Sequence, residues 1–287
     1  MKILVVGAGQ MGGGIAQVAA QAGNDVLLND RDQSYIDRGL GVIKKNFDRN
    51  VEKARMTAED RDRALGRITP LPALKDVDVD VAIEAATENP ELKFDLFRKL
   101  DALTPGRTVL ASNTSSISIT KIGAVTKRPE QVIGMHYFNP VPVMRLVEVI
   151  RGIATSQATF EFANKLAIEH GKTPVEVRNF PGFVSNRILC PMLNEAVFAL
   201  YEGIGTVESI DTVMMLGMNH PMGPLTLSDF IGLDTLLYVM EVLYEGYNDS
   251  KYRPCPLLKE YVDAGWLGRK SGRGFYDYSG PKPVPTR

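Results

Sequence analysis

Cysteine is nearly absent from this 287-residue sequence, and charge of one sign never gathers into a block. The two cysteines, Cys190 and Cys255, lie in no metal-ligand spacing, so we expect neither a disulfide framework nor a metal site. The 33 Lys and Arg residues nearly offset the 34 Asp and Glu residues, for a formal net charge of -1. This balance argues against nucleic acid and anionic membrane surfaces as partners.

Long apolar runs are also missing, because polar residues interrupt each run well short of membrane-spanning length. The chain passes from Met1 directly into a predicted strand and a glycine turn, with no charged region, apolar stretch and cleavage site before them. We therefore expect a cytoplasmic protein. With 44% hydrophobic residues, the length favours two cores over one.

The first 180 residues alternate short apolar strand patterns with helical patterns, which is typical of an α/β fold with a Rossmann-like, mostly parallel sheet. A charged helical hairpin at about residues 34–65 is predicted as an insertion, with helices over 34–50 and 57–65. The predicted strands are Ile3–Val6, Val26–Leu28, Val79–Ile83, Val109–Ala111, Val132–Met135, Leu146–Ile150 and Pro174–Val177.

Strand patterns nearly disappear after residue 180, and long helical patterns replace them. We therefore expect a Rossmann-like domain over residues 1–180 and an all-helical C-terminal domain over residues 181–287. The Pro-rich end, residues 281–287, is expected to be frayed. The predicted C-terminal helices are Ser185–Glu202, Thr206–Leu216, Leu227–Tyr247 and Leu257–Ala264.

A glycine motif, Gly7-Ala8-Gly9-Gln10-Met11-Gly12, follows the first strand and opens a helix. Gly7 permits a tight turn, Gly9 lets the backbone approach a pyrophosphate, and Gly12 lets the helix lie close to the strand. Asp30 ends the second strand, where a carboxylate can bind ribose hydroxyls and repel a 2′-phosphate. The pattern predicts a dinucleotide site that prefers NAD to NADP, although Arg31 could bind that phosphate.

His136 is the best candidate for a catalytic base among the three histidines. It ends an apolar strand, where open parallel sheets place their ligands, whereas His170 sits near a helix end and His220 in a proline-rich loop. Glu148, twelve residues later, is the only charge within the next apolar strand and is costly to bury without a partner. A pair between the two would fix the imidazole tautomer, whereas a glutamate on a solvated strand face is the alternative.

Five motifs in order along the whole chain resemble those of the 3-hydroxyacyl-CoA dehydrogenase family. This resemblance implies reversible hydride transfer between a short-chain (S)-3-hydroxyacyl-CoA and NAD, with no metal. The motifs are Gly7–Gly12, Ala111–Ser116, Gly134–Pro140, Pro181–Arg187 and Gly265–Gly272.

The resemblance also assigns roles to individual residues. It implies that His136 is the base and Glu148 its partner, and that Ser115 and Asn186 hydrogen-bond the substrate's oxygen atoms or the catalytic pair. Taken alone, Ser115 could equally cap the helix that follows it. Ser185 departs from the family pattern, where an apolar residue is expected before Asn186, and this leaves the acyl-chain preference open.

The same resemblance also implies which residues bind the cofactor and coenzyme A, and how the chain assembles. Glu88, Lys93, Asn139 and Lys270 are implied to contact the cofactor, although sequence alone would leave Glu88 and Lys93 as ordinary charges at a helix terminus and Lys270 as a surface lysine. The hairpin is implied to cover coenzyme A, where Lys53 and Arg49 could meet its phosphates. Apolar helices of the second domain favour a homodimer, as does the family.

Two other functions remain open from the sequence. A dehydrogenase of a free 3-hydroxy acid or a sugar acid would share both domain types, but commonly relies on a lysine base. A non-catalytic NAD-binding protein would share the fold alone.

Overall fold

The computed structural model describes residues 1–287, which form two compact units, Met1–Phe180 and Pro181–Arg287. Unit 1 is built on one eight-stranded sheet with the order β3-β2-β1-β4-β5-β6-β7-β8. All neighbouring strands are parallel except β6 and β7, which are antiparallel. The strands are β1 Lys2–Val6, β2 Asp25–Asn29, β3 Ile68–Leu71, β4 Val81–Glu84, β5 Val109–Ser112, β6 Val132–Tyr137, β7 Leu146–Arg151 and β8 Thr173–Arg178.

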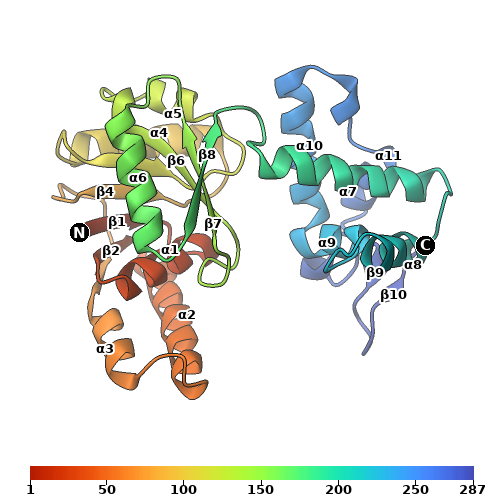
Figure 1. Cartoon of the computed structure of the whole chain (residues 1–287), viewed down its shortest axis with the longest axis horizontal. Helices are drawn as coiled ribbons and strands as arrows, with labels where there is room; N and C mark the ends of the chain where they lie inside the picture. The colour runs from red at the N-terminus through yellow and green to blue at the C-terminus, as the bar shows by residue number, and fades with distance from the viewer. The chain divides into compact units, whose positions relative to one another are not determined.

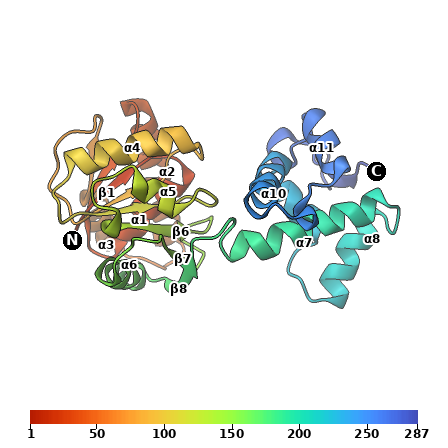
Figure 2. The ribbon, with the colours of Figure 1, turned by 90° about the horizontal axis from the view of Figure 1, so that it is seen from above.

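Helices cover both faces of this sheet, which confirms the expected Rossmann-like class. In Figure 2, α4 lies on one face and α6 on the other. The strands carry near-continuous apolar residues because both faces are buried; every residue of β6 is buried. The helices of unit 1 are α1 Gln10–Gln21, α2 Gln33–Glu52, α3 Ala58–Gly66, α4 Pro90–Leu103, α5 Ile119–Ala124 and α6 Gln157–Glu169, with a 3₁₀ turn at Pro129–Gln131.

The helical hairpin is α2 followed by α3, and it extends beyond the sheet in Figure 1. Three side chains of α2, Ile36, Ile43 and Phe47, join the core that lies under α1. The N-terminus of each helix is capped, with Asp32 accepting from Ser34 N and Thr57 accepting from Asp60 N. The hairpin is therefore anchored to the core of unit 1 by apolar side chains.

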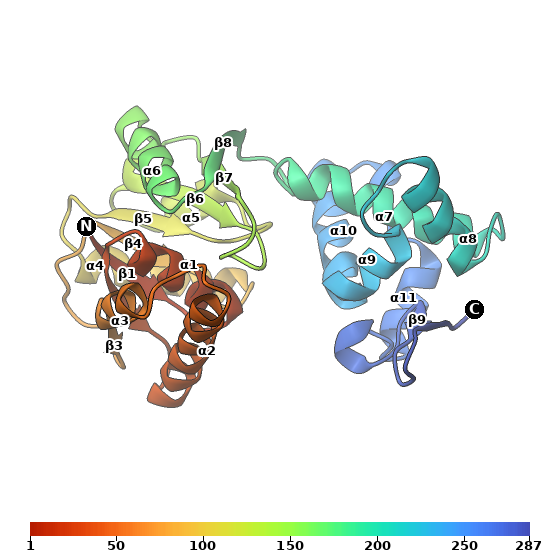
Figure 3. The ribbon, with the colours of Figure 1, turned by 60° about the horizontal axis from the view of Figure 1, so that its bottom comes forward.

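Unit 2 has a separate core in which α7 packs against α9, α10 and α11 (Figure 3). Its helices are α7 Ser185–Tyr201, α8 Val207–Thr212 with a π-helical turn at Val213–Gly217, α9 Pro224–Ile231, α10 Leu233–Tyr247 and α11 Pro256–Asp263, with 3₁₀ turns at Ser250–Tyr252 and Arg269–Ser271. No helix in the chain is long and apolar enough to cross a membrane.

Two predictions of detail are wrong, and one strand was not predicted. The single helix expected over 227–247 is two helices, because Gly232 adopts a φ of 102° that a helix cannot contain. The C-terminal end is not frayed: β10 Val284–Pro285 pairs with β9 Tyr276–Asp277. Strand β3 was not predicted; it contains Pro70 and occupies the sheet edge, where proline is tolerated.

Asp229 fixes the C-terminal segment to the helices of unit 2. The carboxylate is buried and accepts hydrogen bonds from Phe275 N, Tyr276 N and the Tyr278 hydroxyl, each at 2.9 Å. Removing the acceptor would leave buried donors without a partner, which is more costly than losing a surface contact.

Asp229→Ala should therefore lower the free energy of unfolding of unit 2 by about 3 kcal/mol. Urea unfolding followed by the fluorescence of Trp266, the only tryptophan, reports on this unit. The exposed Asp263→Ala is the control and should change the value by less than about 0.5 kcal/mol. Equal midpoints for the two variants would contradict the role given to Asp229.

Candidate active site

The glycine motif forms a turn between β1 and α1 at the carboxyl edge of the sheet. Gly7 has a φ of 105°, and a Cβ at Gly12 would overlap the carbonyl oxygen of Gly7. Nothing lies within 4 Å of where a Cβ of Gly9 would be, so the backbone is open to a ligand at the helix N-terminus. The neighbouring strands β1 and β4 form the switch point of the sheet, where dinucleotides bind. These features fit a pyrophosphate group.

Asp30 holds this turn in place. Its Oδ2 accepts from Ala8 N at 2.7 Å and its Oδ1 accepts from Arg31 N at 2.7 Å. Each carboxylate oxygen keeps a further lone pair with which ribose hydroxyls could bond. The Arg31 guanidinium stacks over the Tyr35 ring, 4.2 Å from its centroid. This aromatic contact holds the arginine that directly follows Asp30 in the chain.

His136 and Glu148 face each other across the antiparallel β6 and β7 ladder. They are register partners, and His136 Nδ1 lies 2.8 Å from Glu148 Oε2. Glu148 is only 2% exposed, so its charge needs the partner. Because an ionised carboxylate only accepts, Nδ1 carries the proton of a neutral ring and Nε2 carries the lone pair. The solvated-face alternative for Glu148 is therefore wrong.

Lys93 lies inside a cluster of charges at the ends of β4 and β5. Its ammonium is 2.6 Å from Glu84 Oε1 and 3.3 Å from Glu88 Oε2, and it also donates to Ala86 O at 3.2 Å. With a side chain 1% exposed and three acceptors for its three protons, Lys93 is no ordinary helix-terminus charge. Any effect of Lys93 on a ligand must pass through the carboxylates that it holds.

Glu88 connects this cluster to the segment that contains Ser115. Its Oε1 accepts from Ser115 N at 2.9 Å and Oγ at 3.2 Å, and from both Thr114 and Ser116. Burial alone would raise the pKa of Glu88, but the Lys93 ammonium and these donors outweigh it and lower the pKa below its usual value. The carboxylate therefore stays ionised at neutral pH.

Ser115 does not cap the following helix. Ser118 is the N-cap of α5 and accepts from Lys121 N, whereas Ser115 bonds to Glu88. The same segment is joined to β6 through Asn113, whose Oδ1 accepts from Tyr137 N at 2.9 Å. The segment that carries Ser115 is thus tied to the residue directly after His136.

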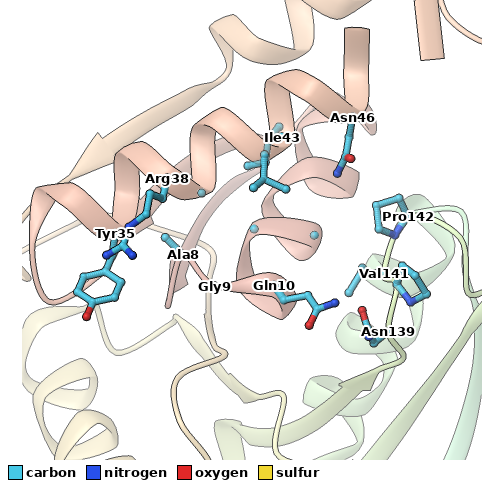
Figure 4. A pocket seen from close by; sticks show the side chains of 15 residues that line it. Ala8, Gly9, Gln10, Tyr35, Arg38, Ile43, Asn46, Asn139, Val141 and Pro142 are labelled. Carbon is cyan, nitrogen blue, oxygen red and sulfur yellow. The ribbon is translucent and has the colours of Figure 1, made fainter. Parts of the chain in front are cut away.

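A cavity of about 500 Å³ opens beside the glycine turn in unit 1. One wall is α2, and the opposite wall is the segment after β6; Figure 4 shows Asn46 and Asn139 on these two sides, with Gln10 between them. The cavity-facing side of α2 continues at three- and four-residue steps to two exposed cations that form no ion pair. This stripe is Tyr35, Arg38, Val42, Asn46, Arg49 and the cap residue Lys53.

Three candidate residues lie in unit 2. Asn186 is in the first turn of α7, where its Oδ1 is 3.8 Å from Cys190 Sγ, and Ser185 begins that helix. Lys270 lies in a 3₁₀ turn and forms an ion pair with Asp234.

Glu84, Ser112 and Asn113 were not identified from the sequence. Glu84 ends an apolar strand, so the lone-charge argument that identified Glu148 also applies to it. Ser112 donates to Glu84 Oε2 at 2.8 Å, a contact that depends on β4 pairing with β5. No sequence pattern marked Asn113 as a functional residue.

Together, the glycine turn at the switch point and the His–Glu pair on the same sheet define a dinucleotide-dependent dehydrogenase. The chain belongs to the 3-hydroxyacyl-CoA dehydrogenase family: residues 2–180 match its NAD binding domain and residues 182–278 match its C-terminal domain. This match confirms the resemblance noted in the sequence and the expectation of NAD as cofactor.

Individual relatives are similar over nearly their whole length. The chain is 55% identical to the 3-hydroxybutyryl-CoA dehydrogenase of Bradyrhizobium diazoefficiens, covering 100% of this chain and 98% of the relative. It is 57% identical to a probable 3-hydroxybutyryl-CoA dehydrogenase of Bacillus subtilis, covering 96% and 97%. The crystal structure of (S)-3-hydroxybutyryl-CoA dehydrogenase from Ralstonia eutropha superposes with a TM-score of 0.95 at 50% identity, covering 97% and 99%.

Glu88→Gln should lower the thermal unfolding temperature at pH 7, because it removes a carboxylate that the fold stabilises in its ionised form. A carboxyl group whose pKa is lowered on folding contributes stability above its unfolded value of 4.5, and this contribution is lost as the pH falls through the folded value. The difference from wild type should therefore shrink at about pH 4 and below.

Circular dichroism melts at both pH values measure this effect. Glu91→Gln, which neutralises an exposed acid in the first turn of α4 just after Glu88, is the matched control and should show a much smaller difference. A Glu88→Gln melt identical to wild type at pH 7 would exclude the stabilised carboxylate.

Proposed function

We propose that this chain catalyses the reversible oxidation of (S)-3-hydroxybutyryl-CoA to acetoacetyl-CoA with NAD. The observation that carries the proposal is the buried His136–Glu148 pair at 2.8 Å, on the sheet that holds the glycine turn. The names of the relatives support the substrate. We also propose that the protein works in the cytoplasm, which cell fractionation would test.

His136 acts in this proposal as the proton acceptor during oxidation. Its Nε2 takes the proton of the substrate's 3-hydroxyl, and Glu148 stabilises the imidazolium that forms. In the reverse direction the imidazolium returns the proton to the keto oxygen. Because a neutral nitrogen receives the proton, this step needs no metal. Ser115 and Asn186 are proposed to hydrogen-bond the substrate's oxygen or the catalytic pair.

The cofactor would be held by the glycine turn and its neighbours. Backbone groups of Gly7–Gly12, including Gln10 and Met11, would receive the pyrophosphate, and Asp30 the ribose hydroxyls. When bound, NAD supplies the hydride acceptor. Glu88, Asn139 and Lys270 are proposed as further cofactor contacts, with Lys93 acting through Glu88.

Coenzyme A would lie along the cavity-facing stripe of α2. Arg49 and Lys53 end this stripe as exposed cations without an ion-pair partner, which suits phosphate groups. The apolar residues of the cavity suit the less charged arm of the thioester.

A homodimer through unit 2 is the proposed assembly. Large apolar side chains are exposed along α7 and the turn after α8, beside an apolar cavity of about 450 Å³ lined by residues of both segments. Such a surface is unusual for a monomer. The exposed residues are Ile188, Tyr201, Ile204, Val213, Met215, Leu216 and Met218.

His136→Gln should lower kcat for acetoacetyl-CoA reduction by roughly 10²- to 10⁴-fold, because the proton-transfer group is lost. NADH oxidation at 340 nm measures turnover, and NADH fluorescence titration should show unchanged cofactor affinity. His220→Gln is the control, with activity near wild type. Near-normal turnover by His136→Gln would remove His136 from the chemistry.

A substrate panel with the wild-type protein separates the proposed function from the alternatives. We expect turnover of acetoacetyl-CoA and none of free acetoacetate, because the cations of α2 have no phosphate to bind in the free acid. Turnover of acetoacetate alone would favour a free-acid dehydrogenase. Binding of NADH without turnover of either compound would favour a non-catalytic protein.

Leu216→Glu should convert the dimer to a monomer in analytical ultracentrifugation at micromolar concentration, because it places a charge in the proposed interface. Leu216 is 81% exposed, so the change should leave the fold of unit 2 intact. Ile153→Glu, at an exposed apolar position of unit 1, should remain a dimer. A wild-type monomer under the same conditions would refute the assembly.

A further inference from the structure

The cavity wall formed by residues 138–145 has few internal supports. This segment joins β6 to β7, and Asn139, Pro140, Val141 and Pro142 line the cavity. The two prolines lack N–H donors. Its own backbone hydrogen bonds run from Val143 N and Met144 N to Pro140 O, both at 2.9 Å.

Lys172 supplies the missing support from the far side of the wall. Its ammonium donates to Val141 O at 2.5 Å and to Met144 O at 2.9 Å. It is the only side chain that hydrogen-bonds the backbone of residues 138–145. Lys172 is 9% exposed and has no carboxylate within ion-pair distance, so these carbonyl oxygens are the acceptors for its buried charge.

The backbone of Lys172 is itself fixed on both sides. Lys172 N donates to Ala167 O at the end of α6, and Thr173 N donates to Arg145 O as β8 begins beside β7. The ammonium therefore extends from a rigid base. Lys172 forms no ion pair with an acidic residue, so no such pair has to break for its ammonium to bind the wall.

A second contact limits the wall on its other side. Val141 is buried against α1, where a Cβ at Gly14 would lie 2.8 Å from Val141 Cβ. The wall thus rests on the close approach of Gly14 and is held by the Lys172 ammonium. Without the ammonium, two carbonyl groups would lose their donor and the segment would shift relative to α1.

We propose that Lys172 is a positioning residue for substrate binding: through the carbonyl groups of Val141 and Met144 it sets the wall of the cavity that faces α2. This inference rests on the proposed function, in which the cavity receives the thioester. Lys172 touches neither the substrate nor His136, so it acts on the binding of acyl-CoA and leaves proton transfer in place.

The test compares Lys172→Met with wild type in acetoacetyl-CoA reduction by NADH. We expect KM for acetoacetyl-CoA to rise about tenfold, equivalent to about 1.4 kcal/mol of binding. kcat should change by less than about twofold, a KM-against-kcat split that general destabilisation would not produce. Lys172→Arg, which keeps the charge and several donors, should recover most of the loss.

Lys165→Met is the matched control, because it removes an exposed lysine from the neighbouring helix α6 and should leave all constants unchanged. Lys172→Gln, which retains a neutral donor, replaces the methionine variant if that variant does not fold, and should show an intermediate KM. A folded Lys172 variant with wild-type KM for acetoacetyl-CoA overturns the inference. It is equally overturned if neither variant folds, since Lys172 would then serve the fold.

Failure of the inference is distinct from failure of the proposed function. If wild-type protein does not reduce acetoacetyl-CoA, the proposed function fails. If wild type reduces it and the Lys172 variants bind it equally well, only the role of Lys172 fails.

Discussion

The antiparallel pairing of β6 with β7 is the constraint on which the site depends. Parallel neighbours need a long crossover, but only residues 138–145 separate these two strands, so the chain must turn back. The return places Glu148 opposite His136 and on the same face of the sheet. A one-residue change of register would move Glu148 to the other face and leave each group buried without the other.

The same short connection also builds one wall of the cavity. Residues 138–145 contain no helix. They lie against the glycine turn and the first helix, with Val141 packed at Gly14. One segment thus begins at the end of β6, after His136, and becomes the wall beside the glycine turn. The position of His136 and the shape of the cavity are consequences of one chain reversal.

Much of this arrangement could be predicted from the sequence because it depends on local patterns. The glycine motif, the hairpin helices and the lone charge in an apolar strand are all visible within short windows, and His136 with Glu148 follows from them. The charge cluster of Glu84, Glu88 and Lys93 could not be predicted in the same way. Its members lie at the end of β4 and just after it, but the partner Ser112 comes from the neighbouring strand β5, and the burial of Lys93 exists only once both strands are paired. Gly232 was missed for a related reason, since periodic apolar residues continue on both sides of the break.

The two walls of the cavity are held by different forces, and this difference has a consequence for recognition. The α2 wall is fixed by apolar side chains, Ile36, Ile43 and Phe47, whose many small contacts tolerate the loss of any one. The opposite wall depends on one ammonium and two carbonyl groups, which are directional and costly to leave unpaired. A substitution under α2 should therefore act gradually through stability, whereas a change at the lysine acts directly on the shape that a ligand meets. Under the proposed function, we expect selectivity among acyl groups to be more easily altered from the wall after β6 than from the hairpin.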